Sequence, residues 1–374
     1  MKVFLLYGDL VGPGPVWRNG AWAQFNALSD CFDATYLGAP WNDEGGHRRL
    51  GRLLRPLRSA PAWAEALCEK VRAEHDPDGP NILIHLVNRS AMVAWSQHLQ
   101  PVWSLFTHRV MYVVDTLQPD HVDPAIAKRY DLIASWCQDL SATFEAAFCV
   151  PTIYWPSHTD VLNFHSMREA RPIDLIVVGR RDGHLHSPLH RHFNDPSRDR
   201  LFLDFVTRTQ GEMGAEQEFR LLAATMTRAA AAFCFEASDR PRFMGRSPFM
   251  VRWIYAWMAG CTVFGSRPTG PGAQSQMDWE ESMFDLPSDP GAAIACIEGV
   301  LSDRDGLARR RRINVIESLR RHDTRHRMCD LLGRLGLDVP ERLQAGLDRL
   351  SARIAELADG SRDGGRPTLS GDRA

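Results

Sequence analysis

The chain has 374 residues, enough for two domains of ordinary size, and 44% hydrophobic and 24% charged residues are typical of a folded globular protein. The formal net charge of −2 gives no basic field over the whole molecule, which argues against nucleic acid as a partner. No apolar run reaches the roughly 18 residues that span a bilayer, so we expect no integral membrane segment.

Eight cysteines are spread along the sequence, and none forms a C-x-x-C pair. Several lie inside apolar stretches, for example Cys234 between Phe233 and Phe235. This pattern is typical of buried, reduced thiols and not of a disulfide framework or a zinc site. We therefore expect a cytoplasmic protein.

The first half alternates between short apolar runs and helical patterns. Strands are predicted at residues 2–7, 34–37, 81–85, 109–115 and 130–135, and helices at 20–28, at 61–74 and from about Ser141. The strands show no polar alternation and are separated by helices, which is typical of a parallel sheet covered on both faces. Residues 150–156 are interpreted as an extended linker.

The second half repeats this alternation. Strands are predicted at residues 173–178, 229–235 and 262–264, and helices at 251–259, 290–302 and 303–321. The sequence therefore predicts an α/β protein with two doubly wound domains, over residues 1–157 and 158–335.

A C-terminal helix is predicted over residues 336–358. Its apolar residues recur at spacings of four and three and form one seam: Leu343, Leu347, Leu350, Ile354 and Leu357. We expect this seam to dock on the protein's own surface and not to form a dimer coil. Residues 359–374, which are rich in Gly, Ser, Asp and Arg, are expected to be disordered.

The order of local motifs in the second half resembles that of GT-B glycosyltransferases. The segment from Pro156 to Phe164 matches the pattern P-x-x-x-D-x-x-x-F, and the next strand ends in Val178-Gly179-Arg180, like the family's V-G-R strand. Residues 252–261 resemble its R-x-x-E-A-x-A-x-G helix, and residues 321–327 resemble its closing H-x-T-x-x-R segment. Within the GT-B enzymes, the sequence most resembles the group-1 and CgeB-like families. The resemblance covers roughly residues 130–330 by motif and residues 1–129 by topology alone.

The resemblance implies two Rossmann-like domains with the active site in the cleft between them. The implied reaction moves a sugar from a nucleotide-sugar donor to a small-molecule, glycan or peptide acceptor. The first domain would hold the acceptor and the second the donor, which is a substrate, so neither a cofactor nor a metal is expected. The alternatives are a sugar-nucleotide epimerase and a non-catalytic carbohydrate- or partner-binding protein on the same scaffold.

The resemblance assigns donor binding to Arg180, Ser247, Arg252, Tyr255, Gly260 and Thr262. Guanidinium groups and N–H groups at a helix start suit a diphosphate. Three of these positions also have an ordinary structural explanation: Arg180 in a solvated turn, Ser247 as a helix N-cap, and Gly260 as a helix-ending glycine.

One position departs from the family pattern. Tyr255 stands where the family carries a glutamate that holds the ribose hydroxyls. Three outcomes follow: Tyr255 gives a weaker hydrogen bond, Glu280 or Glu281 substitutes, or donor binding is altered or lost.

The acceptor side is predicted at the end of the first sheet. The loop with Gly8, Asp9 and Gly12 follows the first strand and is either near the acceptor or a plain surface turn. Asp115 ends a predicted strand and is a candidate general base for an acceptor hydroxyl, with a loop or capping role as the alternative. His85, at another predicted strand end, is the rival base.

Two further sequence patterns are interpreted as ordinary structure and not as binding sites. His184, His186, His190 and His192 form an H-x-H-x3-H-x-H string, which we interpret as a polar loop and helix start and not as a zinc site. The arginines at residues 309–312 are interpreted as a solvated helix face and not as a nucleic-acid patch.

Overall fold

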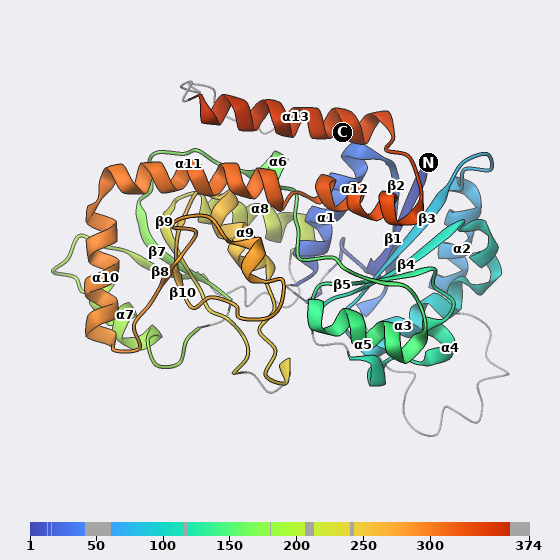
Figure 1. Ribbon diagram of the computed structural model, residues 1–374, viewed down its shortest axis with the longest axis horizontal. Coiled ribbons are helices and arrows are strands. Elements are labelled where there is room, and N and C mark those ends of the chain that lie inside the picture. The colour runs from blue at the N-terminus through green and yellow to red at the C-terminus, as the bar shows by residue number, and fades with distance from the viewer. Residues whose placement is uncertain are drawn as a thin grey trace.

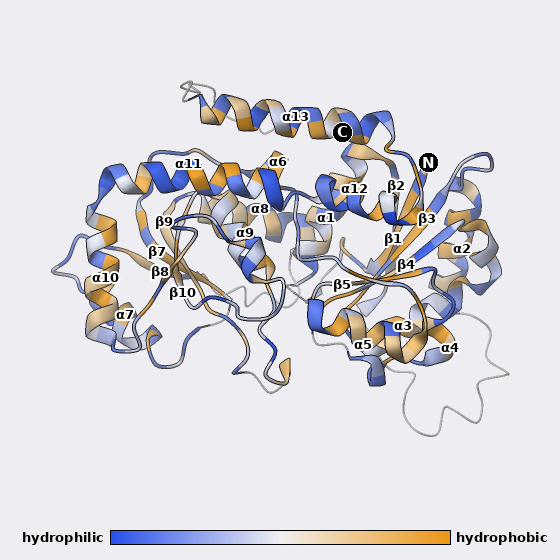
Figure 2. Cartoon of the chain, viewed as in Figure 1, coloured by the Kyte–Doolittle hydropathy of each residue, from blue (hydrophilic) through white to orange (hydrophobic). Residues whose placement is uncertain are grey.

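A computed structural model describes residues 1–12, 14–15, 17–41, 61–115, 118–179, 181–205, 213–239 and 243–359. Two α/β halves lie side by side, each with a parallel sheet between helices (Figure 1). The strands are the most consistently apolar elements, whereas most helices carry polar residues along one side (Figure 2). This is the distribution expected for sheets buried on both faces.

The first sheet has six parallel strands in the order β2-β1-β3-β4-β5-β6. They are β1 (Lys2–Gly8), β2 (Asp33–Ala39), β3 (Asn81–Val87), β4 (His108–Val113), β5 (Leu132–Ser135) and β6 (Thr152–Tyr154). The central strands β1 and β3 are buried along their whole length. Leu5 of β1 pairs with Tyr36 on one side and Ile84 on the other, which fixes the register.

The helices of the first half connect these strands. They are α1 (Arg18–Cys31), α2 (Ala62–Glu74), α3 (Ser90–Val93), α4 (Pro124–Ala127) and α5 (Gln138–Phe148), with 3-10 helices η3 (Ala94–Leu105) and η4 (Pro119–His121).

The second sheet has five parallel strands in the order β11-β10-β9-β7-β8. They are β7 (Ile173–Val178), β8 (Phe202–Phe205), β9 (Ala229–Cys234), β10 (Thr262–Gly265) and β11 (Phe284–Asp285). The helices are α6 (Val161–Phe164), α7 (His186–Phe193), α8 (Ala215–Met226), α9 (Val251–Met258), η6 (Gln274–Gln276), α10 (Pro290–Ser302) and α11 (Arg304–Arg321). Two parallel α/β domains were predicted, and the structure confirms them.

The C-terminal helices join the two halves. Helix α12 (Thr324–Leu335) contacts α1, and α13 (Glu341–Ala358) contacts both α1 and α11. Figure 1 shows α13 lying across α11 and α12. Leu343, Leu350 and Leu357 of the predicted seam are buried, so α13 docks on its own chain as expected. Of the predicted tail, residues 360–374 lie outside the described part.

Some predicted boundaries were wrong. Residues 150–156 contain strand β6, which pairs with β5 through Ser135 and Tyr154, and are not a plain linker. Strand β3 continues two residues past His85, and β4 stops two residues before Asp115. Helix α9 begins at Val251 with Met250 as its N-cap, so Ser247 does not cap it.

Candidate functional site

The carboxyl ends of the two sheets face one another. The carbonyl of Leu10, which follows β1, accepts a hydrogen bond of 2.9 Å from the backbone N–H of Ala215 at the start of α8. The ring centroid of Trp136, which follows β5, lies 6.5 Å from that of Phe243 in the second half. Ligands of parallel α/β sheets bind beyond the carboxyl ends of the strands. The boundary between the halves is therefore the candidate site.

A carboxylate lies at this edge of the second sheet. Glu236, two residues beyond β9, accepts hydrogen bonds from the hydroxyls of Ser247 and Ser238, both at 2.7 Å, and from the backbone N–H of Ser238. The Ser247 hydroxyl also accepts a 3.0 Å bond from the N–H of Thr269, so the segment between β9 and α9 meets the segment that follows β10 here. Burial opposes ionisation of Glu236, but the bonds from Ser247 and Ser238 outweigh it and hold the pKa below its usual value.

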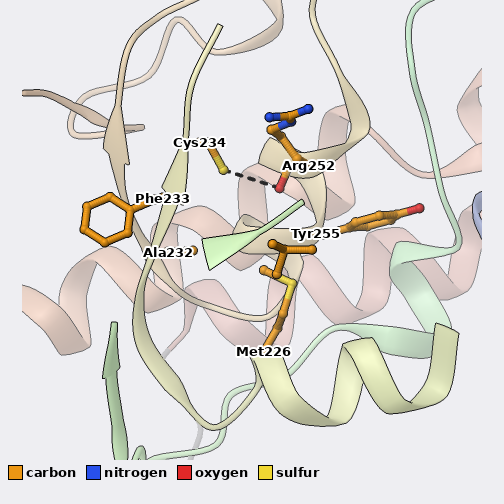
Figure 3. Close-up of a pocket in the computed structure, with 7 residues that line it drawn as sticks. Met226, Ala232, Phe233, Cys234, Arg252 and Tyr255 are labelled. Atoms are coloured by element: carbon orange, nitrogen blue, oxygen red, sulfur yellow. Dashed lines mark hydrogen bonds between the residues drawn. The ribbon is translucent and has the colours of Figure 1, made fainter. Parts of the chain in front are cut away.

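Arg252 reaches the same edge from the first turn of α9. Its Nη1 donates to the carbonyl of Phe235 at 3.5 Å, immediately beyond β9. Figure 3 shows the guanidinium extending away from Tyr255, although both side chains come from α9. The cavity lined by these residues has a volume of about 10 Å³, close to that of one water molecule, so a nucleotide does not fit inside it.

The loop after β1 forms the facing side. The carboxylate of Asp9 accepts the backbone N–H groups of Val11 and Gly12, at 2.9 and 3.1 Å, which fixes the turn. A Cβ on Gly8 would lie 2.2 Å from the ring of Trp41, so only glycine fits there. The loop contacts α8 of the second half. The Asp9 carboxylate is engaged in hydrogen bonds within the loop.

Asp115 lies on the same side, two residues beyond β4. Its backbone has a φ of +59°, a left-handed conformation that is uncommon for a residue with a side chain. Its carbonyl accepts the indole N–H of Trp136 at 2.9 Å. Burial raises the pKa of the Tyr7 hydroxyl, and the nearby charge of Asp115 raises it further. The Tyr7 hydroxyl also accepts a 3.4 Å hydrogen bond from the Asn88 side chain. Asp115 therefore lies beyond the carboxyl end of β4, and its role as a base stays a prediction.

Comparison with known proteins rests on structure, since no family model and no curated protein matches the sequence. Anabaena Alr3699/HepE in complex with UDP and glucose superposes with a TM-score of 0.54 at 11% identity, covering 90% of this chain and 99% of that one. OtsA in its apo form gives a TM-score of 0.55 at 10% identity, covering 91% and 100%. An alpha-glucosyltransferase in complex with UDP and a 13-mer DNA gives 0.58 at 10% identity, covering 89% and 98%.

The chain has the GT-B fold. The similarity extends over nine-tenths of the chain and nearly all of each neighbour, so both domains and their order are shared. At these identities the fold alone is established, and the roles of individual side chains rest on the geometry of this chain.

Two residues that were predicted to bind the donor lie at the opposite edge of the second sheet. Gly260 ends α9 with a φ of +73° and precedes β10, and Thr262 is the first residue of that strand. The carboxyl end of β10 is Gly265, so Gly260 and Thr262 are at its amino end, and Thr262 is 1% exposed. The structure does not bring them to Arg252.

Tyr255 does not face the candidate site either. Its ring packs edge-on against Phe219 of α8 at 5.6 Å, and its hydroxyl lies 3.0 Å from where a Cβ on Gly20 of α1 would be. Among the described residues this buried hydroxyl has no hydrogen-bond partner, and burial raises its pKa. Glu281 pairs with Arg309 and Arg310 of α11, at 3.1 and 3.2 Å, and is committed there.

His85 is inside the first sheet and not at its edge. It is fully buried, pairs with Met111 in the β3–β4 ladder, and its Nδ1 lies 2.6 Å from the hydroxyl of Tyr130. Burial lowers its pKa to about 3. The prediction that His85 is a base at the strand end was therefore wrong.

Two further basic segments were predicted. Arg180 lies outside the described residues; the next residue, Arg181, forms an ion pair with Asp204. Of the four arginines at 309–312, Arg310 is 3% exposed and lies 3.5 Å from Asp303, so the run is not a uniformly solvated face.

The histidine string does not converge. His186 pairs with Asp204 at 3.2 Å, whereas His192 pairs with Glu298 at 2.6 Å. Over the described ranges, no three His, Cys, Asp or Glu side chains come together as metal ligands. None of the helices described here combines the length and apolar character needed to cross a membrane.

Proposed function

We propose that the chain is a metal-independent hexosyltransferase that moves a sugar from a nucleotide-sugar donor to an acceptor hydroxyl in the cytoplasm. The observation that carries the proposal is the meeting of Glu236, Ser247 and Arg252 at the carboxyl edge of the second sheet, opposite Asp115. Structures of two neighbours contain UDP, and HepE has also been seen with UDP-glucose, which supports a donor of this class.

Glu236 is proposed to accept the ribose hydroxyls of the donor. It carries a negative charge, lies beyond a strand end, and is held by the hydroxyls of Ser247 and Ser238. In the motif resemblance, the residue that binds the ribose hydroxyls stands at the position of Tyr255. Glu236 was not predicted from the sequence. The pattern that could have indicated it is an acidic residue two positions after an apolar strand.

Arg252 is proposed to stabilise the diphosphate that leaves when the sugar is transferred. A guanidinium held in place before the reaction stabilises developing charge without reorganisation. Asp115, across the boundary, is proposed to take the proton of the acceptor hydroxyl, a role worth about 10²–10⁴ in rate.

Calorimetric titration with UDP tests the proposal. Wild-type protein should bind UDP, and Arg252→Ala should weaken binding by about 10- to 100-fold, because one charge-assisted contact is worth roughly 1.5–3 kcal/mol. Arg334→Ala, on an exposed part of α12, is the matched control and should bind UDP like wild type. Equal affinity in the Arg252 variant would remove that residue from the donor site.

A non-catalytic binding protein is the second candidate, because Tyr255 is turned away from the site. Incubation with UDP-glucose and a panel of acceptors separates the two. A glycosylated product that is absent with Asp115→Asn supports transfer, whereas UDP binding with neither transfer nor hydrolysis supports the binding protein. Nucleic acid is not proposed as the acceptor, since the net charge is −2, although one neighbour was solved with DNA.

A further inference from the structure

A polar cavity lies at the amino edge of the second sheet, away from the candidate donor site. Its volume is about 450 Å³, within the usual range for small-molecule sites. Its walls include Ala230 near the start of β9, Gly260 just before β10, and Leu301 and Leu307 from α10 and α11. The charged residues in its lining are Arg171, Arg200, Arg304, Arg311, Glu169 and Asp174.

The positive charges in this cavity exceed the negative ones. Arg200 forms a 2.6 Å ion pair with Asp174, so those two charges offset each other. Arg171, Arg304 and Arg311 then face the single carboxylate of Glu169, which leaves a surplus of two positive charges among the lining residues.

Arg171 is fixed in place by the backbone and not by an acid. Its Nε, Nη1 and Nη2 donate to the carbonyls of Arg168, Ala229 and Ala259 at 3.0, 2.6 and 2.7 Å. Carbonyl groups orient the guanidinium but do not neutralise it. Burial, reinforced by the nearby charge of Arg311, lowers the pKa of Arg171 to about 10, so the fold disfavours this charge as it stands.

Arg311 lies beside it. A Cβ on Gly260 would meet Arg311 Cγ at 2.6 Å and Arg171 Nη2 at 2.8 Å, so the two side chains converge over this glycine. The Nε of Arg311 is buried and has no hydrogen-bond partner within the described ranges. Burial lowers the pKa of Arg311 too, although Glu169 opposes the shift. A buried donor without a partner is costly, and an anion would satisfy it.

We propose that this cavity is a second anion site, which binds a phosphate group, either free or carried by a small organic molecule, between Arg171, Arg304 and Arg311. Guanidinium forks match phosphate oxygens in geometry and in charge. The site does not depend on the proposed transferase reaction, because it lies at the other edge of the sheet from Arg252.

Calorimetric titration of the full chain with inorganic phosphate tests this site. Wild type should bind phosphate saturably, and Arg311→Gln should weaken binding by about tenfold or more. Arg304→Gln changes an exposed side chain, and it should weaken binding by a smaller factor. Arg312→Gln, an exposed neighbour outside the cavity, should leave the affinity unchanged.

A second arm separates this site from the donor site and identifies the source of the phosphate. The phosphate binding that Arg311→Gln weakens should be retained in Arg252→Ala. Titration with glycerol 3-phosphate follows: tighter binding than phosphate indicates an organic ester, and equal or weaker binding indicates free phosphate. Absence of saturable phosphate binding, or binding that Arg252→Ala abolishes and both Arg311→Gln and Arg304→Gln retain, would overturn the proposal.

Discussion

Tyr255 occupies the position at which the GT-B motif has a ribose-binding acid, yet its hydroxyl is buried against α1 and α8. Within the described part of the chain this hydroxyl has no hydrogen-bond partner, and a buried phenol without one costs free energy, so Tyr255→Phe should raise the free energy of unfolding by about 1 kcal/mol. UDP affinity should not change, because the hydroxyl does not reach the donor. Urea unfolding and calorimetry check both statements; a large loss of UDP affinity would return Tyr255 to the donor site.

His85 makes stability depend on pH. Its pKa is about 3 in the folded protein and near 6.5 in the unfolded chain, so below pH 6.5 the unfolded state binds the extra proton. The free energy of unfolding should therefore fall by about 2 kcal/mol between pH 7 and pH 5 on account of this residue. His85→Gln should show that much less loss over the same range in urea unfolding. Identical losses in variant and wild type would show that His85 is not the titrating group.

Candidate site residues could be predicted where a sequence motif fixes their place, but not where tertiary contacts define them. Arg252 was predicted as a candidate because it lies in the first turn of a helix that resembles a family motif. The direction of Tyr255 depends on which face of α9 meets α8, which no local pattern encodes. The surroundings of Glu236 are set by Ser247, eleven residues away, and by Thr269, which binds Ser247 from the segment after β10.

At the scale of elements, helices α1 and α8 join the two halves through a buried ion pair. Arg18 and Glu218 are both fully buried, with Nη2 and Oε1 3.7 Å apart, and burial raises the pKa of Glu218. Arg18 also donates to the carbonyls of Gly12 and Met213, so it links the loop after β1 to the start of α8.

Removal of the cation would leave a buried carboxylate unpaired. Arg18→Met should lower the free energy of unfolding by about 3–5 kcal/mol, and the double variant Arg18→Met/Glu218→Met should recover part of it. Arg220→Met, which breaks an exposed pair with Glu216 on the same helix, should cost no more than about 1 kcal/mol. Urea unfolding checks all three variants, and similar losses in the two single variants would contradict a buried bridge.

The strands of both sheets could be predicted because they are apolar runs buried on both faces. Strand β6 was missed, since a three-residue strand in a short segment bounded by Pro151 and Pro156 resembles a linker until β5 supplies a pairing partner. The ends of β3 and β4 were misplaced for the same reason: pairing with neighbouring strands, and not local composition, decides where a strand stops.

At the scale of the whole molecule, one buried arginine ties the two halves together. Arg325 of α12 bonds to Asp160 in the connecting segment at 3.0 Å, to Asp323 at 2.9 Å, and to Asp30 of α1 at 2.6 Å. The sequence predicts two domains, because each has its own alternation of strands and helices. How their edges meet depends on contacts between residues more than 100 positions apart.

The central claim is that a nucleoside diphosphate binds at the carboxyl edge of the second sheet. A crystal structure of the chain soaked with UDP tests it most directly. We expect ribose hydroxyls within hydrogen-bond distance of Glu236 and diphosphate oxygens at the guanidinium of Arg252. UDP bound elsewhere, with Glu236 and Arg252 both out of reach, would contradict it.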